Sequence, residues 1–237
     1  MNLPSTLRRA LALLALALPL LAPAQEATIR KALTERIPGL SGIDEISKSP
    51  MPGLFEVRIG NDIFYTDPEG NYLIQGALID TRARKNLTEE RINKLTAIDF
   101  KDLQLKNAFT VVRGNGKRKV AVFEDPNCPY CKRFEADLEK IDNVTVHTFL
   151  IPILGPDSVE KSRQIWCSAD KAKTWDDWML RHVTPKGAPK CDTAALDANV
   201  AFARKYNITG TPTLVFIDGH RVPGAINTQQ IEQLLAR

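Results

Sequence analysis

Four cysteines are the residues of this 237-residue chain whose types and spacing point most directly to chemistry. Cys128-Pro-Tyr-Cys131 is a CxxC motif between a predicted strand and a predicted helix. The spacing places one sulfur at the start of the helix and the other one turn inside. Unpaired N–H groups and the positive end of the helix dipole stabilise a thiolate there, so we expect a lowered pKa for Cys128. Cys131 should be less accessible and placed to resolve a mixed disulfide.

A CxxC motif can also be half of a zinc site. The other half would be Cys167 and Cys191, which 23 residues separate, whereas paired zinc ligands lie much closer in sequence. Redox chemistry is therefore the better interpretation, and we predict neither a metal ion nor a cofactor.

A second signal is Gly210-Thr-Pro-Thr213, which opens a predicted strand. Proline cannot donate to a strand ladder, so at the head of a strand it marks an edge, a bend or a cis peptide bond. Downstream of a strand–CxxC–helix–strand unit, we favour a cis bond before Pro212, beside the dithiol. Such a bond would expose the backbone of Thr211 for pairing with an extended substrate.

The first 24 residues have the pattern of a secretory signal peptide. Arg8 and Arg9 precede an apolar run over residues 10–21, which ends at the small-x-small triplet Ala22-Pro-Ala24. The run is shorter than the roughly 20 residues that a membrane-spanning helix needs, so we predict cleavage and export. In an oxidising compartment the even set of four cysteines can form disulfides.

Composition excludes several classes of protein. Thirteen Gly and 15 Pro without a period exclude a collagen-like chain, and 43% hydrophobic residues exclude a disordered one. The net charge of +4 falls to +2 without Arg8 and Arg9, because residues 1–24 contain no acid. So small a charge does not indicate nucleic-acid binding.

Residues 25–80 have the pattern of a small separate domain. Apolar residues at a spacing of four predict a helix over 27–37, which Pro38-Gly39 ends. Strand-like segments follow at 54–59, 63–66 and 72–79, separated by turn-forming residues. One helix and an antiparallel meander make a marginal core, so we expect the sheet edge to pair with a second copy in a two-fold dimer.

Residues 81–106 are charged and helix-prone, and we interpret them as a helical linker, although an ordinary surface helix fits equally well. Residues 107–237 then show a strand at 119–124, a helix after the CxxC motif and a strand at 144–151, which together predict a βαβ unit. A helical stretch spans about 157–206, followed by two short strands and a final helix. This order predicts a thioredoxin-type fold with a helical insert, within an α+β protein.

The chain resembles the periplasmic disulfide isomerases of the DsbC/DsbG family. The resemblance rests on Asp125-Pro-Asn-Cys-Pro-Tyr-Cys-Lys-Arg-Phe134, Gly210-Thr-Pro-Thr213 and Asp218-Gly-His-Arg-Val-Pro-Gly224. It implies a V-shaped homodimer with cystatin-like N-terminal domains and two thioredoxin-like domains. Cys128 would attack, Cys131 would resolve, and the residues expected to contact substrate are Pro129, Tyr130, Thr211 and Pro212.

Within the family, the Pro after the first cysteine is typical of DsbG-like members. Cys167 and Cys191, however, resemble the extra structural disulfide of DsbC-like members, and we give this pair more weight. A second redox pair is the alternative role for these two cysteines, but their wide spacing favours a structural bond. Closing a loop of this size is worth about 3 kcal/mol.

Thioredoxins and DsbA have a buried acid six residues before the first cysteine, and this chain has Val122 there. Proton transfer to the resolving thiol must therefore use another group or water. Glu124 is the nearest candidate for this role, although its place at the end of a strand favours a solvated carboxylate.

The function that we predict is isomerisation or reduction of wrong disulfides in misfolded secreted proteins. The resemblance implies a periplasmic location and a membrane reductase of the DsbD type that keeps the dithiol reduced. The alternatives are a DsbG-like reductase of protein sulfenic acids, a holdase chaperone with an incidental dithiol, and a net oxidase.

Overall fold

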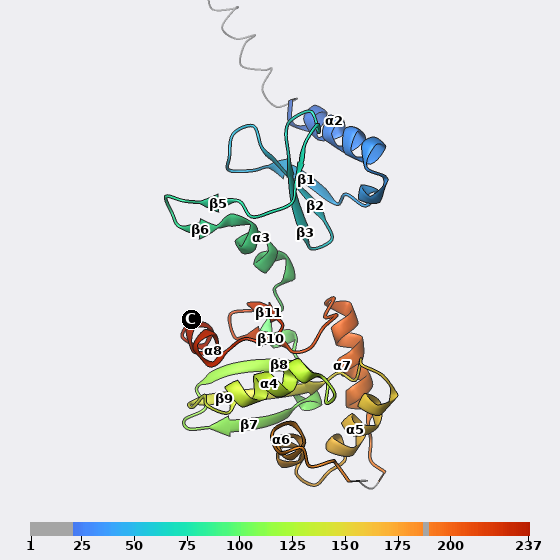
Figure 1. Cartoon of the computed structure of the whole chain (residues 1–237), viewed down its shortest axis with the longest axis vertical. Coiled ribbons are helices and arrows are strands. Elements are labelled where there is room, and N and C mark those ends of the chain that lie inside the picture. The colour runs from blue at the N-terminus through green and yellow to red at the C-terminus, as the bar shows by residue number, and fades with distance from the viewer. Residues whose placement is uncertain (1–20, 187–189) are drawn as a thin grey trace, which may run out of the picture. The chain divides into compact units, whose positions relative to one another are not determined.

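The computed structural model describes residues 21–186 and 190–237, which divide into two compact units (Figure 1). The division falls between Leu95 and Thr96, within the segment that the sequence predicts as a linker. Most of the predicted signal peptide, residues 1–24, lies outside the described residues. Residues 21–24 form the first turn of a helix.

The N-terminal unit is one helix packed on an antiparallel meander, as predicted. Ile29 and Leu33, one turn apart on the helix, are buried against Phe55 and Val57 of the sheet. Gly60 has a φ of +60°, a conformation that suits glycine in the two-residue turn between the second and third strands. The elements are α2 (Leu21–Arg36), the 3-10 helix η1 (Pro38–Leu40), β1 (Glu45–Lys48), β2 (Phe55–Ile59), β3 (Asp62–Thr66) and β4 (Leu73–Ile74), and the strand order is β1-β2-β3-β4.

The segment after β3 differs from the prediction. The single strand expected over 72–79 is divided around Gly76 into β4 and β5 (Ile79–Asp80), because glycine weakens a strand interior. β5 pairs with β6 (Lys85–Asn86) in a separate two-stranded sheet. The segment 81–106, predicted as a helical linker, therefore contains a strand as well as helices.

The only α-helix of that predicted linker is α3 (Leu87–Thr96), which the side chain of Asn86 caps through the N–H of Glu89 at 3.1 Å. Two 3-10 helices follow it, η2 (Phe100–Asp102) and η3 (Leu105–Asn107). Ile98 does not extend the helical face that the sequence suggested. It is buried in the core of the second unit, where its N–H donates to the Gly219 carbonyl at 3.1 Å.

The second unit contains a five-stranded sheet in the order β11-β10-β8-β9-β7. β8 and β9 are parallel and are connected through α4, which confirms the predicted βαβ unit. The edge strand β7 was not predicted. The elements of this sheet and its C-terminal helix are β7 (Phe109–Arg113), β8 (Arg118–Glu124), α4 (Pro129–Leu138), β9 (Val144–Leu150), β10 (Thr213–Phe216), β11 (Arg221–Pro223) and α8 (Thr228–Leu235).

Side chains of β8 alternate between two buried faces of the sheet. Val120 and Val122 share a core cluster with α4 and α8, whereas Phe123 packs with Ala203 of α7 on the opposite face. Glu124 is two residues beyond Val122 and therefore points to the α4 face.

The helical stretch predicted at about 157–206 consists of three helices, α5 (Pro156–Trp166), α6 (Lys171–Arg181) and α7 (Ala194–Lys205). A disulfide joins Cys167, at the end of α5, to Cys191, ahead of α7, with their Cα atoms 5.6 Å apart. The bond leaves neither cysteine available as a thiol and, within the insert, connects the end of α5 to the segment before α7. The architecture is the α+β arrangement with a thioredoxin-type unit that the sequence predicts.

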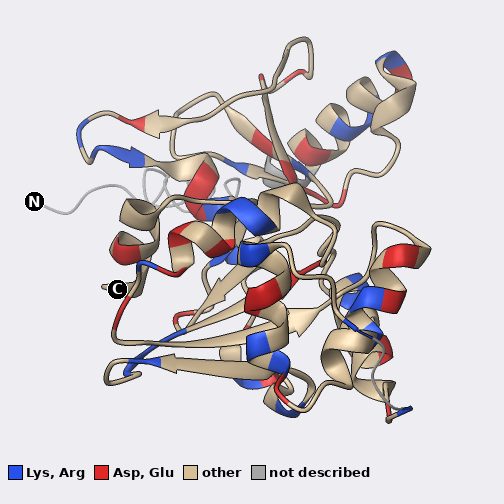
Figure 2. Cartoon of the chain, turned by 60° about the horizontal axis from the view of Figure 1, so that its bottom comes forward, with Lys and Arg blue, Asp and Glu red and all other residues tan. Residues whose placement is uncertain are grey.

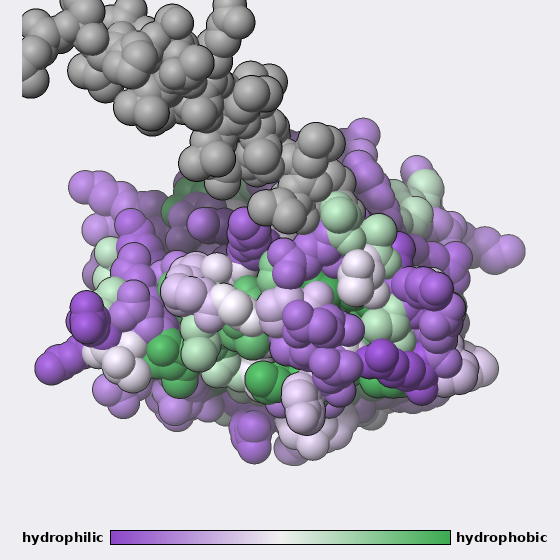
Figure 3. All heavy atoms as spheres, turned by 90° about the horizontal axis from the view of Figure 1, so that it is seen from above, coloured by the Kyte–Doolittle hydropathy of each residue, from purple (hydrophilic) through white to green (hydrophobic). Residues whose placement is uncertain are grey.

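Charged side chains of both signs are interspersed along the described elements (Figure 2), which fits the small net charge of +4. Apolar side chains are also visible among polar ones on the face seen from above (Figure 3). Within residues 21–186 and 190–237, no helix has the length and apolar character needed to cross a bilayer.

Replacing both Cys167 and Cys191 by serine should lower the free energy of unfolding by about 3 kcal/mol, because the unfolded chain regains the entropy of an open loop. Denaturant titration of the parent and variant proteins measures the difference. An unchanged free energy of unfolding would contradict a stabilising role for this bond.

Candidate active site

The dithiol lies at the N-terminal end of α4. Cys128 is the residue that precedes the helix, Pro129 is its first residue, and Cys131 lies in its first turn. Pro129 suits this position because the first helical N–H groups have no intrahelical partner. Cys128 and Cys131 are both free thiols in this structure.

Asp125 holds the loop that carries the dithiol. Its buried carboxylate accepts hydrogen bonds from the backbone N–H groups of Asn127, Ile153 and Leu154 at 2.8, 2.8 and 3.0 Å, and from the Ser158 hydroxyl at 2.7 Å. It therefore connects the segments that follow β8 and β9. The sequence analysis did not assign this role, although an acid directly after a buried strand and before a CxxC motif was a usable signal.

The pKa of Cys128 is lowered to about 5. The largest cause is a hydrogen bond with the Cys131 thiol, and the Thr211 side chain and the backbone N–H groups of Tyr130 and Cys131 also favour the thiolate. Burial opposes them, since Cys128 is only 3% exposed. The structure thus supports the lowered pKa that the position at a helix N-terminus predicts.

Cys131 differs sharply from its neighbour. It is fully buried, and burial raises its pKa above that of a free thiol, with the Cys128 sulfur and the Glu124 carboxyl group adding to the shift. At neutral pH the pair therefore consists of one thiolate and one thiol. This is the asymmetry that a nucleophile and a resolving thiol need.

The loop before β10 brings the second predicted motif to the dithiol. The Thr211–Pro212 peptide bond is cis, and the Thr211 carbonyl oxygen lies 3.2 Å from the Cys128 sulfur. Pro212 is buried, and its own carbonyl accepts the Gly224 N–H at 2.8 Å. Tyr130, 59% exposed, lies two residues after Cys128, and its backbone N–H stabilises the Cys128 thiolate. The residues that the sequence predicts to contact substrate therefore border Cys128.

The prediction that Glu124 is a solvated acid is wrong. It is 0% exposed, and no described group satisfies the full geometry of a hydrogen bond to either carboxylate oxygen. Burial raises its pKa well above the usual range, and the nearby carboxyl of Glu135 raises it further. Glu135, on α4, is also buried and accepts a hydrogen bond from the Trp175 indole N–H at 2.7 Å.

Glu135 was missed because an acid inside an amphipathic helix resembles an ordinary surface residue. Its position four residues after Cys131 places it on the same helix face, which is a signal that could have identified it.

The helical insert packs against the dithiol. Cys128 and Cys131 belong to one apolar cluster with Trp175 and Met179 of α6. The Trp178 indole N–H donates to the Pro126 carbonyl at 2.6 Å, which connects α6 to the loop before the CxxC motif. The insert therefore supplies the apolar surroundings that keep Cys131 protonated.

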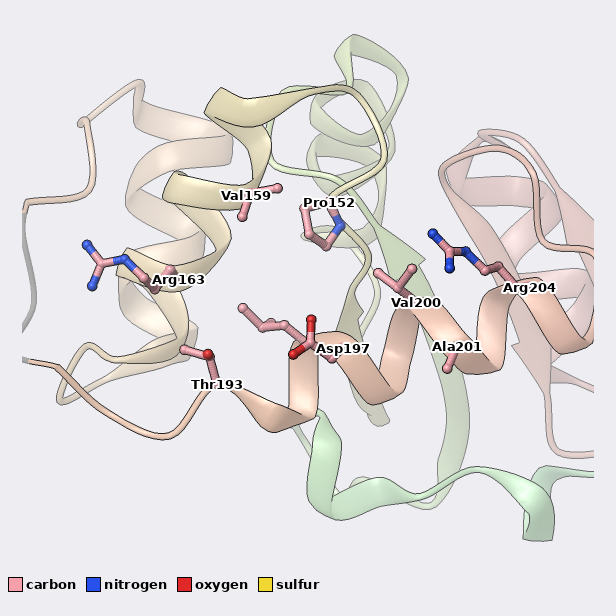
Figure 4. Close-up of a pocket in the computed structure, with 9 residues that line it drawn as sticks. Pro152, Val159, Arg163, Thr193, Asp197, Val200, Ala201 and Arg204 are labelled. Carbon is pink, nitrogen blue, oxygen red and sulfur yellow. The ribbon is translucent and has the colours of Figure 1, made fainter.

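A cavity of about 400 Å³ lies between α5 and α7 (Figure 4). Val159, Leu196 and Val200 give it apolar walls, and Arg163 and Arg204 add charge. No residue of the dithiol or of the cis-proline loop lines it, so the candidate chemistry is located elsewhere. Among the residues that the structure describes, no group of three His, Cys, Asp or Glu side chains is arranged to hold a metal ion.

A low-pKa cysteine and a buried thiol at a helix N-terminus, beside a cis-proline loop on this fold, define a thiol–disulfide oxidoreductase. Comparisons with known proteins agree. Residues 105–237 match the thioredoxin-like domain, and residues 21–89 match the disulfide bond isomerase protein N-terminal domain.

The probable thiol:disulfide interchange protein DsbC of Bordetella pertussis is 43% identical over 211 residues, which cover 89% of this chain and 74% of that protein. The thiol:disulfide interchange protein DsbC of Escherichia coli K12 is 28% identical over 90% of this chain and 89% of its own. A crystal structure of a disulfide interchange protein from Neisseria gonorrhoeae, 42% identical, matches 56% of this chain and 96% of its own with a TM-score of 0.54. The chain belongs to the DsbC family of thiol:disulfide interchange proteins.

Titration of the reduced protein should show a thiolate that forms with a midpoint near pH 5. Cys131→Ala should raise this midpoint, because the hydrogen bond from the Cys131 thiol is the largest cause of the lowered pKa of Cys128. The ultraviolet absorbance of the thiolate measures both proteins, with Cys128→Ser as the blank. An unchanged midpoint in Cys131→Ala would contradict the role of this hydrogen bond.

The same shift makes the stability of the reduced protein depend on pH. The folded pKa of Cys128 is below the value of 9.0 for a free thiol, so its contribution to stability is fully present above about pH 9. That contribution declines as the pH falls and is lost once the pH passes below about 5.

Proposed function

We propose that this protein isomerises or reduces non-native disulfides in exported proteins through Cys128 and Cys131. The observation that supports this function best is the ionisation asymmetry of the pair: Cys128 has a pKa of about 5, and Cys131 remains a thiol. The Thr211 backbone beside the Cys128 sulfur offers an extended client a place to form hydrogen bonds.

In the proposed reaction, the Cys128 thiolate attacks one sulfur of a client disulfide, which forms a mixed disulfide and releases a client thiolate. A second client thiol can then displace Cys128, which reshuffles the client's bonds and regenerates the dithiol. Alternatively, Cys131 attacks the Cys128 sulfur, which oxidises the dithiol to a disulfide and leaves the client reduced by two electrons.

Cys128→Ser should abolish both reshuffling of scrambled ribonuclease and reduction of insulin, because it removes the attacking sulfur. Cys131→Ser should lose insulin reduction, accumulate mixed disulfide and retain part of the reshuffling, since a client thiol can still release Cys128. Activity regained by ribonuclease and precipitation of insulin measure the two reactions. Reshuffling by Cys128→Ser at the parent rate would disprove the mechanism.

We further propose that the N-terminal unit forms a two-fold dimer through its sheet edge. β4 is the last strand of its sheet among the described residues, and large apolar side chains at and just before it are exposed. Tyr72 is 74% exposed and Ile74 is 50% exposed, which is unusual for large apolar side chains at a strand edge. Pairing with the same edge of a second copy would cover these side chains.

Ile74→Asp should convert the dimer to a monomer, since a charge at the paired edge would be buried without a partner. The variant should keep insulin reduction and lose most of its reshuffling of scrambled ribonuclease. Val112→Asp is a matched control, because it places the same charge on an exposed strand residue of the other unit. Sedimentation velocity measures the state of assembly, and a dimeric Ile74→Asp protein would contradict the proposal.

The setting that suits this chemistry is the periplasm, to which the predicted signal peptide would direct the chain. Isomerisation requires the reduced dithiol, whereas an exported protein meets an oxidising environment. A membrane reductase of the DsbD type would supply the electrons, and the clients would be misfolded secreted proteins that contain disulfides.

A further inference from the structure

Glu124 is a buried carboxyl that the proposed roles of the two cysteines do not use. It is the last residue of β8 and faces α4, on the same side of the sheet as Val122. Neither of its oxygens has a hydrogen-bond partner of full geometry among the described residues, although burial of a carboxyl normally demands one. The Cys131 thiol lies close enough to shift its pKa.

The groups around Glu124 come from three further elements. Glu135 on α4 is the closest acidic neighbour, and its carboxylate is stabilised by the Trp175 indole N–H of α6. The other titratable or charged groups that act on this pair are Cys128, directly before α4, Cys131 of α4, Arg113 of β7 and Asp176 of α6.

Because Trp175 stabilises the charged form of Glu135 and no full hydrogen bond stabilises that of Glu124, the proton of the pair resides on Glu124. A carboxyl with a raised pKa is, once ionised, a stronger base than an ordinary carboxylate. This suits it to accept a proton from a thiol.

We propose that Glu124 is the proton acceptor for Cys131 when this thiol resolves the mixed disulfide. The inference rests on the proposed roles of Cys128 and Cys131 and adds the group that activates the second of them. In the step, the Cys131 S–H bond breaks and its proton passes to the Glu124 carboxylate. The Cys131 sulfur then bonds to the Cys128 sulfur, and the bond between Cys128 and the client breaks with its electron pair leaving on the client thiolate.

The charge on Cys128 influences this transfer. Burial is the largest cause that raises the pKa of both Glu124 and Cys131, and a Cys128 thiolate raises both further, so both keep their protons in the resting dithiol. Formation of the mixed disulfide removes this negative charge, and both groups then lose a proton more readily. Glu124 first releases its own proton to solvent, and its carboxylate then accepts the proton of Cys131 as that sulfur attacks.

The two sulfurs can be followed separately with one equivalent of 5,5′-dithiobis(2-nitrobenzoate). Attack by Cys128 releases the first thionitrobenzoate, and attack by Cys131 on the resulting mixed disulfide releases the second. In full-length Glu124→Gln the first phase should keep its rate, and the second should slow about a hundredfold. The parent's second phase should rise with pH and level off as Glu124 ionises, whereas that of Glu124→Gln should keep rising without levelling.

Glu139→Gln is the matched control, because Glu139 is an exposed acid at the end of the same helix. Both of its phases should equal those of the parent. Glu124→Asp retains a carboxyl at a greater distance, so its second phase should be slower than the parent's but should still level off with pH. An unchanged first phase shows that each variant keeps its folded site.

A second phase in Glu124→Gln with the parent's rate and pH profile would overturn this inference and leave the proposed function intact. A parent protein without a fast first phase would instead overturn the role of Cys128, and the inference with it.

Discussion

The hydrogen bond between the two active-site sulfurs makes the largest contribution to the lowered pKa of Cys128. This hydrogen bond lowers the pKa of Cys128 only while Cys131 keeps its proton, because a second thiolate would repel the first. Burial of Cys131 in the apolar cluster that α6 completes ensures this. These features therefore act together. The helix N-terminus stabilises the charge on Cys128, and the cis-proline loop lies beside that charge. The insert keeps Cys131 uncharged.

Two buried carboxyls lie beside this pair, and their burial opposes stability. An ionised acid without full compensation in a core costs free energy, and a second acid nearby adds repulsion. Glu135 is compensated by Trp175, whereas Glu124 lacks such a partner. A strained electrostatic arrangement of this kind is common where proton transfer is required. Thioredoxins have their buried acid at the position of Val122. Val122 lies two residues before Glu124 and faces the same side of the sheet, so an acid at 124 reaches the same layer of the core.

Much of this arrangement could be predicted because it depends on local patterns. The CxxC spacing predicted that Cys128 lies at the start of α4 and Cys131 in its first turn, and the proline after Thr211 predicted the cis bond. Hydrophobic periodicity predicted the N-terminal helix and meander and the βαβ unit. It failed at two places within residues 72–106: Gly76 interrupts a strand, and Ile98 packs in the second unit rather than along α3.

The sequence by itself determined which backbone segments form helices and strands and which sulfur begins a helix, since these follow from hydrogen bonding and side-chain period within a few residues. Only the tertiary structure decided the environment of each acid. Glu124 was expected to be solvated, and it is buried because α4 covers the end of β8. Asp125 connects loops about 30 residues apart, and Glu135 meets Trp175 from another helix. Burial and charge pairing depend on segments distant in sequence, which no local pattern specifies.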